Sequence, residues 1–200
     1  MKAFAKRAFK YFGILLLTGV SVIALLALIP ITATVKPIQP TADTHYWSMP
    51  GNYRIAYQKV ASNNQQKKAP IIFLHGGPGG YIHSSIVKTL APISNSGRDL
   101  YFYDQSGTGL SDRREHPKDT TLHGHVEDLY EIITRQIKAE KVVIIGQSYG
   151  AQIATGMAVL HPELVEKLIL SSPEDIDPVE FDENGRPRNE IRYPVPANLT

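Results

Sequence analysis

The chain has 200 residues, of which 42% are hydrophobic and 20% charged, which is typical of a globular protein with one domain and one core. Its 21 basic and 19 acidic residues leave a net charge of +2, too small a field to predict binding to nucleic acid. There is no cysteine, which excludes disulfides, thiolate metal sites and a cysteine nucleophile.

The first 35 residues predict a membrane segment. Between Lys10 and Lys36 lie 25 residues without a formal charge. As a helix they would be about 37 Å long, enough to cross a hydrocarbon core of about 30 Å. The basic residues near the N-terminus favour a cytoplasmic N-terminus and an extracytoplasmic domain; they are Lys2, Lys6, Arg7 and Lys10. A cleaved signal peptide, followed by secretion, is the alternative interpretation.

Residues 36–50 contain three prolines and predict an extended linker without secondary structure. From residue 51 to 173, short apolar runs alternate with helical patterns. We expect an early antiparallel strand at 53–60, then strands at 70–74, 100–103, 141–145 and 167–170, with helices at 84–91, 121–139 and 151–160. Apolar strands alternating with helices predict an α/β fold, in which a mostly parallel sheet is covered by helices on both faces.

A Gly-x-Ser-x-Gly pattern follows the run at 141–145. Gly146-Gln147-Ser148-Tyr149-Gly150 matches a nucleophile elbow, in which a serine occupies a sharp turn between a strand and a helix. The flanking glycines are expected to be required sterically, because the chain folds back on itself there. The pattern alone is weak, and a non-catalytic turn is the alternative; its position between a β-branched run and a helix favours Ser148 as a nucleophile.

A glycine-rich stretch, His75-Gly76-Gly77-Pro78-Gly79-Gly80, follows the apolar run at 70–74. Acyl transfer needs hydrogen-bond donors where negative charge develops, and backbone amides in turns supply them. We expect the N–H groups of Tyr149 and Gly77, with Gly76 as the second choice for the latter, to form an oxyanion hole. An ordinary turn or a phosphate-binding loop is the alternative, but the lysine of a phosphate loop is missing.

These two motifs, together with Asp104-Gln105-Ser106-Gly107-Thr108-Gly109-Leu110-Ser111, resemble the proline iminopeptidase-like branch of the α/β-hydrolases over about residues 50–173. The resemblance implies an α/β-hydrolase fold with Ser148 as nucleophile, an oxyanion hole at Gly77 and Tyr149, and a structural loop at Asp104. The chain departs from the family at Ser106, where the family usually has arginine, and at Gln147 and Tyr149. We therefore expect peptide or ester substrates rather than a strict preference for an N-terminal proline.

A serine hydrolase of this fold also needs an acid and a histidine, in that order after the serine. The single histidine after Ser148 is His161, which we interpret as structural because it ends a helix. Asp175 is a weak candidate for the acid, since residues 174–200 are interpreted as the interrupted start of a lid. His123 and His125 lie two apart on a helix, so we expect no metal site and no cofactor.

Two hypotheses follow. The first is a membrane-anchored serine hydrolase whose C-terminal part, with the acid and the histidine, is missing, so that the 200-residue chain turns over nothing. The second is a non-catalytic α/β module or truncated pseudoenzyme that binds a partner or an acyl ligand through an exposed sheet edge.

Overall fold

The computed structural model describes residues 2–27, 37–64, 68–116, 118 and 120–173. It divides the chain into two compact units, Met1–Pro37 and Ile38–Thr200. The predicted lid at residues 174–200, including Asp175, lies outside the described residues.

The first unit contains helix α1 (Lys2–Ala27). Within the part of the chain that the structure describes, no helix is both long enough and apolar enough to pass through a membrane. The expected membrane anchor is therefore not supported. The helix begins among the basic residues, and the rest of the predicted span, residues 28–35, lies outside the described residues. The predicted location of the domain stays a prediction.

The second unit is built around one six-stranded sheet. Its strands are β1 (His45–Met49), β2 (Tyr53–Val60), β3 (Ile71–Leu74), β4 (Leu100–Tyr103), β5 (Val142–Gln147) and β6 (Val165–Ser171). They lie in the order β1-β2-β4-β3-β5-β6. β2 pairs antiparallel with β1 and β4, whereas β4, β3, β5 and β6 run parallel. The prediction of an early antiparallel strand and a mostly parallel sheet is confirmed.

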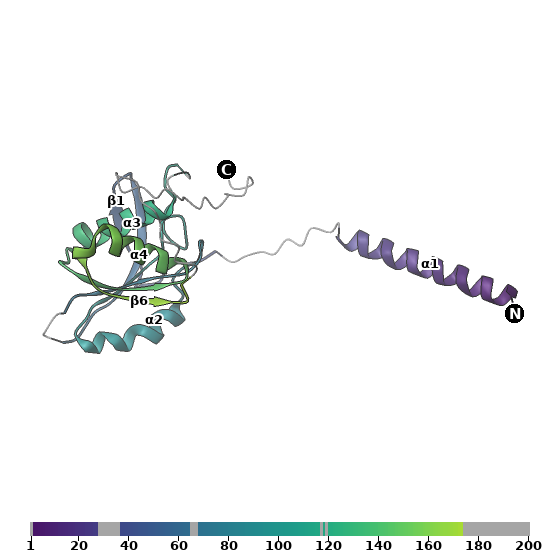
Figure 1. Cartoon of the computed structure of the whole chain (residues 1–200), viewed down its shortest axis with the longest axis horizontal. Coiled ribbons are helices and arrows are strands. Elements are labelled where there is room, and N and C mark those ends of the chain that lie inside the picture. Colours follow the sequence, from purple (N-terminus) through teal and green to yellow (C-terminus); the bar gives the residue numbers. More distant parts are fainter. Residues whose placement is uncertain (1, 28–36, 65–67, 117, 119, 174–200) are drawn as a thin grey trace. The chain divides into compact units, whose positions relative to one another are not determined.

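Helices cover both faces of this sheet, as predicted (Figure 1). α2 (Ser84–Leu90) and the short 3₁₀ helix η1 (Ala91–Ser96) pack on one face, where they cover Phe73 and Phe102. α3 (Leu122–Glu131) and α4 (Tyr149–Leu160) pack on the other face. The helix predicted at 121–139 begins at the N-cap Thr121, whose side chain accepts from Gly124 N–H, and its last turns are the π-helical η3 (Ile132–Ile137).

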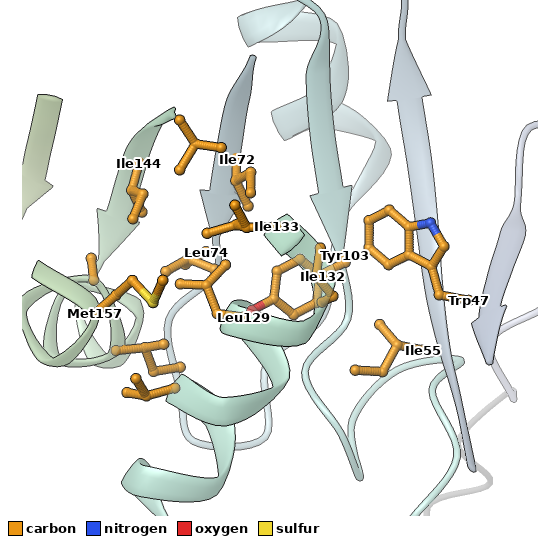
Figure 2. Packing of buried hydrophobic residues seen from close by; sticks show 14 of the residues in the cluster. Trp47, Ile55, Ile72, Leu74, Tyr103, Leu129, Ile132, Ile133, Ile144 and Met157 are labelled. Atoms are coloured by element: carbon orange, nitrogen blue, oxygen red, sulfur yellow. The ribbon is translucent and has the colours of Figure 1, made fainter. Parts of the chain in front are cut away.

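The larger core lies between the sheet and the α3–α4 layer. Figure 2 shows Ile72 and Ile144 from neighbouring strands facing Ile133 and Met157 from the helices. All four side chains are fully buried. The apolar runs of β3 and β5 place large side chains on both faces, which explains why each of these two strands lies between two others in the sheet.

The linker predicted at residues 36–50 was wrong over its second half, because β1 occupies His45–Met49. Trp47 and Met49 alternate toward the core, and the Trp47 ring stacks on Tyr57 of β2 with 3.8 Å between centroids. Gly51 and Asn52, both with positive φ, turn the chain between the two strands. This hairpin buries an aromatic side chain that a solvated linker would expose.

The topology brings the two motif-bearing loops together. β3 and β5 are parallel neighbours, with Leu74 opposite Gly146 at their carboxyl ends. The chain leaves β3 toward the α2 face and leaves β5 toward the α4 face, so the direction of the crossover connections reverses between these two strands. In open α/β sheets, ligands bind at such a switch point.

Candidate active site

Ser148 occupies the turn between β5 and α4 in a strained conformation, with φ of 50° and ψ of −121°. Few residues other than glycine adopt such angles, and the surrounding structure must enforce them. Part of that enforcement is the hydrogen bond from Ser148 N–H to the Ser171 carbonyl at the end of β6, 2.9 Å long. The serine is half-buried rather than enclosed, and it directly precedes the first residue of α4.

The two glycines that flank Ser148 are required sterically, as the motif predicts. A Cβ on Gly146 would lie 2.5 Å from the Gly150 carbonyl oxygen. A Cβ on Gly150 would lie 2.3 Å from the Leu74 carbonyl oxygen and 2.8 Å from that of His75. The second collision is with the end of β3 rather than with the elbow itself. Gly150 therefore allows the elbow to approach the glycine-rich loop closely.

The glycine-rich loop after β3 lies against the elbow. A Cβ on Gly76 would lie 3.1 Å from Ser148 Cβ and 3.7 Å from Ser148 Oγ. Gly77 has φ of 152°, and a Cβ there would lie 2.6 Å from Gly79 N, so only glycine fits this turn. The structure thus brings together the two loops that the sequence predicts to form one site.

His75, at the end of β3, is buried and fully engaged with its neighbours. Its Nδ1 lies 2.8 Å from the Gly76 carbonyl oxygen, and its Nε2 accepts a 3.1 Å hydrogen bond from Gln105 N–H. These partners fix the neutral tautomer that carries its proton on Nδ1. Burial lowers the pKa of His75, which also favours the neutral ring.

Asp104 organises the loop that follows β4, in agreement with the structural role expected for it. Its carboxylate accepts from Ile82 N–H at 2.6 Å and from Leu110 N–H at 2.8 Å. A Cβ on Gly109 would lie 2.1 Å from Asp104 Oδ2, so glycine is needed for this close approach. Burial raises the pKa of Asp104, while the two backbone hydrogen bonds act in the opposite direction.

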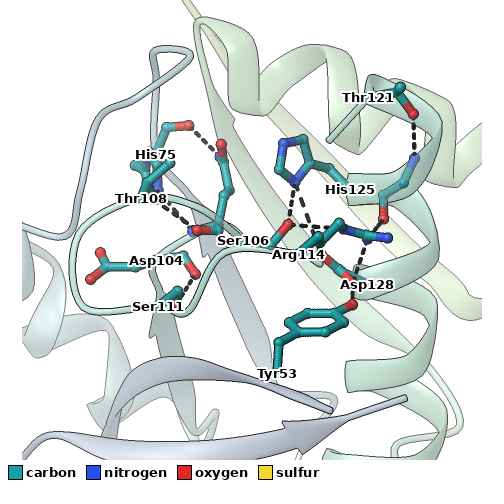
Figure 3. Close-up of polar contacts among 12 residues, drawn as sticks. Tyr53, His75, Asp104, Ser106, Thr108, Ser111, Arg114, Thr121, His125 and Asp128 are labelled. Atoms are coloured by element: carbon teal, nitrogen blue, oxygen red, sulfur yellow. Dashed lines mark hydrogen bonds and ion pairs between the residues drawn. The ribbon is translucent and has the colours of Figure 1, made fainter. Parts of the chain in front are cut away.

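Beside this loop lies a buried polar cluster on α3 (Figure 3). Arg114 Nη2 forms a 2.7 Å ion pair with Asp128 Oδ1 and donates to the Gly124 carbonyl at 2.6 Å. Tyr53 OH donates to the same Asp128 oxygen. Ser106 Oγ accepts from Arg114 Nε at 3.3 Å. The arginine therefore joins the end of the 104–114 loop to the helix.

His125 connects this cluster to the elbow. Its Nδ1 lies 3.3 Å from Ser106 Oγ, and its ring stands edge-on to the Tyr149 ring with 5.8 Å between centroids. Burial and the nearby Arg114 charge lower the pKa of His125 to about 3, so the ring is neutral at physiological pH. Burial raises the pKa of Asp128 and outweighs the opposing effect of Arg114.

Within the part of the chain that the structure describes, Ser148 has no base hydrogen-bonded to its hydroxyl. Neither His75 nor His125 acts as this base, because each ring is hydrogen-bonded to the loops described above. His161 follows the last residue of α4, a helix of 12 residues and about 18 Å, and so lies at the far end from Ser148. There its ring packs on Tyr130 at 4.3 Å between centroids, a structural contact. In the same described ranges, no group of side chains could hold a metal ion.

The sequence alone did not predict the buried polar cluster. Arg114 lies in a charged stretch typical of a solvated loop, and Ser106 differs from the family pattern without any local sign that it is buried. A signal was present on α3, where His125 and Asp128 fall on the same helical face as Leu129 and Ile132. Polar residues on an apolar face predict a buried network that needs partners from elsewhere.

Comparison with known proteins agrees with this architecture. A family model described as "alpha/beta hydrolase fold" matches residues 69–190, more than half of the chain. The chain is 37% identical to the proline iminopeptidase of Saccharolobus solfataricus over 102 residues, which cover 51% of this chain and 32% of that protein. It is 37% identical to the enzyme of the same name from Heyndrickxia coagulans over 124 residues, covering 60% and 40%.

The chain spans only about a third to two fifths of the length of these relatives. A crystal structure of a Mycobacterium smegmatis proline iminopeptidase is 27% identical with a TM-score of 0.54, covering 62% of this chain and 42% of that one. VinJ, at 24% identity and a TM-score of 0.57, shares the fold over 67% of this chain and 45% of its own. This chain belongs to the α/β-hydrolase family and is similar, within it, to the proline iminopeptidases.

Proposed function

We propose that the protein is a serine hydrolase, or the nucleophile-bearing part of one, that cleaves peptide or ester bonds through an acyl-enzyme. The observation that carries the proposal is the close approach of two loops at the ends of β3 and β5. Ser148 stands on a strained turn at the start of α4, and a Cβ on Gly76 would lie only 3.1 Å from Ser148 Cβ. A non-catalytic turn has no need of this strain.

In the proposed reaction, Ser148 Oγ attacks the substrate carbonyl carbon while a base takes the hydroxyl proton. The carbonyl oxygen becomes an oxyanion, for which we propose the N–H groups of Gly77 and Tyr149 as donors. The tight turn at Gly77 and the position of Tyr149 as first residue of α4 support this choice. The tetrahedral intermediate then expels the amine or alcohol, which takes the proton, and water releases the acyl group from Ser148.

The base and the acid of this mechanism are proposed to come from outside the described residues. His75 and His125 are engaged in buried hydrogen bonds, and His161 lies at the distal end of α4. Without a base, a serine hydroxyl is a weak nucleophile. Slow acylation of the 200-residue chain alone is therefore the expected result.

The substrate class follows from the relatives. Those named above are called proline iminopeptidases, and by likeness we propose peptides with a free N-terminus or small esters as substrates. Ser106 and Tyr149 depart from the family pattern, so a strict requirement for proline is not part of the proposal.

The test replaces the missing base by free imidazole. The chain is incubated with a fluorophosphonate probe and increasing imidazole, and the labelled residue is identified by peptide mass spectrometry. Ser148 attacks phosphorus, fluoride leaves, and imidazole takes the proton. We expect labelling of Ser148 that rises with imidazole, disappears in Ser148→Ala, and persists in Ser96→Ala, a control at an exposed serine of η1.

Absence of labelling at Ser148 at every imidazole concentration, or labelling no faster than that of exposed serines, would refute the proposal. The second candidate, a binding module, would then be favoured by β6. Among the described strands β6 pairs only with β5, and its Ile169 side chain is 45% exposed.

A further inference from the structure

Two consecutive residues in the loop after β4 reach in different directions. Gln105 and Ser106 are each only 1% exposed, and they directly follow Asp104. Gln105 contacts the loop after β3, whereas Ser106 contacts α3. These are the surroundings of the two proposed oxyanion donors, Gly77 and Tyr149.

The Gln105 contacts hold the glycine-rich turn. Its backbone N–H donates to His75 Nε2 at 3.1 Å, and its side-chain amide donates to the His75 carbonyl at 2.9 Å. His75 Nδ1–H donates in turn to the Gly76 carbonyl at 2.8 Å, which is the carbonyl of the peptide unit that carries Gly77 N–H. The orientation of that peptide unit is therefore coupled to Gln105 through His75.

The Ser106 contacts hold the elbow. Ser106 Oγ lies 3.3 Å from His125 Nδ1, and the His125 ring packs edge-on against the buried Tyr149 ring. Arg114 holds the serine from the other side with its Nε at 3.3 Å and is itself fixed by Asp128 (Figure 3). The position of the Tyr149 side chain is therefore coupled to the same loop.

Part of this arrangement lowers the stability of the fold, which indicates a role other than stabilisation. Gln105 Oε1 is buried, and within the described part of the chain it has no hydrogen-bond partner. An unpaired buried acceptor destabilises a fold, and this cost offsets part of the stability that Gln105 gains by donating to the His75 carbonyl. Such violations are expected where a side chain is held for function.

We propose that Gln105 and Ser106 are positioning residues that set the two halves of the oxyanion hole relative to one another, Gln105 through His75 to Gly77 and Ser106 through His125 to Tyr149. The proposal rests on the proposed function of Ser148, which it deepens. Neither residue touches the substrate in this arrangement. Each acts on one donor, so loss of either contact displaces one half of the hole and leaves the other in place.

Two variants separate the halves. Gln105→Met keeps the length of the side chain and the backbone N–H that donates to His75 Nε2, and removes only the amide that donates to the His75 carbonyl. Ser106→Ala removes only the hydroxyl. The matched control is Ser94→Ala, which removes another buried serine hydroxyl that donates within η1 to the Ala91 carbonyl at 2.8 Å. Backbone amide chemical shifts are measured by two-dimensional NMR for each protein, together with the imidazole-dependent rate of Ser148 labelling.

We expect Gln105→Met to shift the amide signals of Gly76 and Gly77 and to leave that of Tyr149, and Ser106→Ala to do the reverse. Each variant should slow labelling about tenfold, less than the roughly hundredfold or greater loss typical when a donor is removed. Ser94→Ala should change neither these amide signals nor the rate of Ser148 labelling. Shifts at both sites in both variants, or at neither, would overturn the proposal. If wild type resists labelling, the proposed function is refuted instead. The pattern of amide shifts still tests whether Gln105 is coupled to Gly77 and Ser106 to Tyr149.

Discussion

We predict that the buried His125 lowers the stability of the protein at acid pH, and the size of this loss follows from the surroundings of its ring. The ring is buried on α3, and burial together with the Arg114 charge lowers its pKa from 6.5 to about 3. The native ring thus stays neutral over a pH range in which the unfolded chain binds a proton. Stability from this residue is complete above about pH 6.5 and is lost as the pH falls from there toward 3.

The loss is about 1.4 kcal/mol per pH unit below the unfolded pKa. Between about pH 7.5 and 5.0 it amounts to roughly 2 kcal/mol, a large share of the 5–15 kcal/mol typical of a domain. His125→Gln keeps a hydrogen-bonding group toward Ser106 and does not titrate. We therefore expect its free energy of unfolding to fall by roughly 2 kcal/mol less than that of wild type over this interval.

The assay is urea unfolding of both proteins at the two pH values, with His116→Gln as an exposed control that should follow wild type. Burial lowers the pKa of His75 as well, but His75 is present in all three proteins and cancels in the comparison. If His125→Gln lost as much stability as wild type on acidification, the native His125 ring would not be the neutral, proton-resisting imidazole that its burial predicts.

Three further predictions concern the architecture. Gly150→Ala places a Cβ 2.3 Å from the Leu74 carbonyl oxygen. We therefore expect the free energy of unfolding, measured with urea, to fall by about 3 kcal/mol or more. A variant as stable as wild type would contradict the tight contact between the elbow and the end of β3. Arg114→Met leaves the Asp128 carboxylate buried without its cation, so we expect the free energy of unfolding to fall by about 3–5 kcal/mol. Arg114→Met combined with Asp128→Leu should recover much of that loss in a double-mutant cycle. Additive losses in the two single variants would disprove the coupling. Trp47→Ala should cost about 3–5 kcal/mol if β1 belongs to the core, and a loss below about 1 kcal/mol would restore the linker interpretation.

The central part of the fold could be predicted because its signals are local. The short apolar runs at 71–74 and 142–145 predict buried strands, and glycines follow each of them within two residues. The steric need for Gly146 and Gly150 followed from the elbow motif, although the partner of Gly150 did not. That partner is the end of β3, some 75 residues earlier in the chain, and no local pattern contains it.

Features that depend on distant partners could not be predicted. β1 is short, and the proline content around it suggested a linker; its reason for being a strand is the stacking of Trp47 on Tyr57. The Arg114–Asp128 ion pair joins a loop to a helix, and neither segment alone has a sequence pattern that predicts a buried ion pair. The N-terminal expectation depended on a count of uncharged residues, about a third of which fall outside the described residues.

The most direct test of the account uses the absence of cysteine in the chain. Ser148→Cys and Ser96→Cys each contain a single thiol, whose pKa is read from the pH dependence of alkylation by iodoacetamide. At the N-terminus of α4, beside backbone N–H groups, we expect the thiol of Ser148→Cys to have a pKa roughly 0.5–1 unit below that of the exposed control. A thiol at this position that titrates with or above the control, or that cannot be alkylated, would contradict the placement of residue 148 at an anion-stabilising elbow.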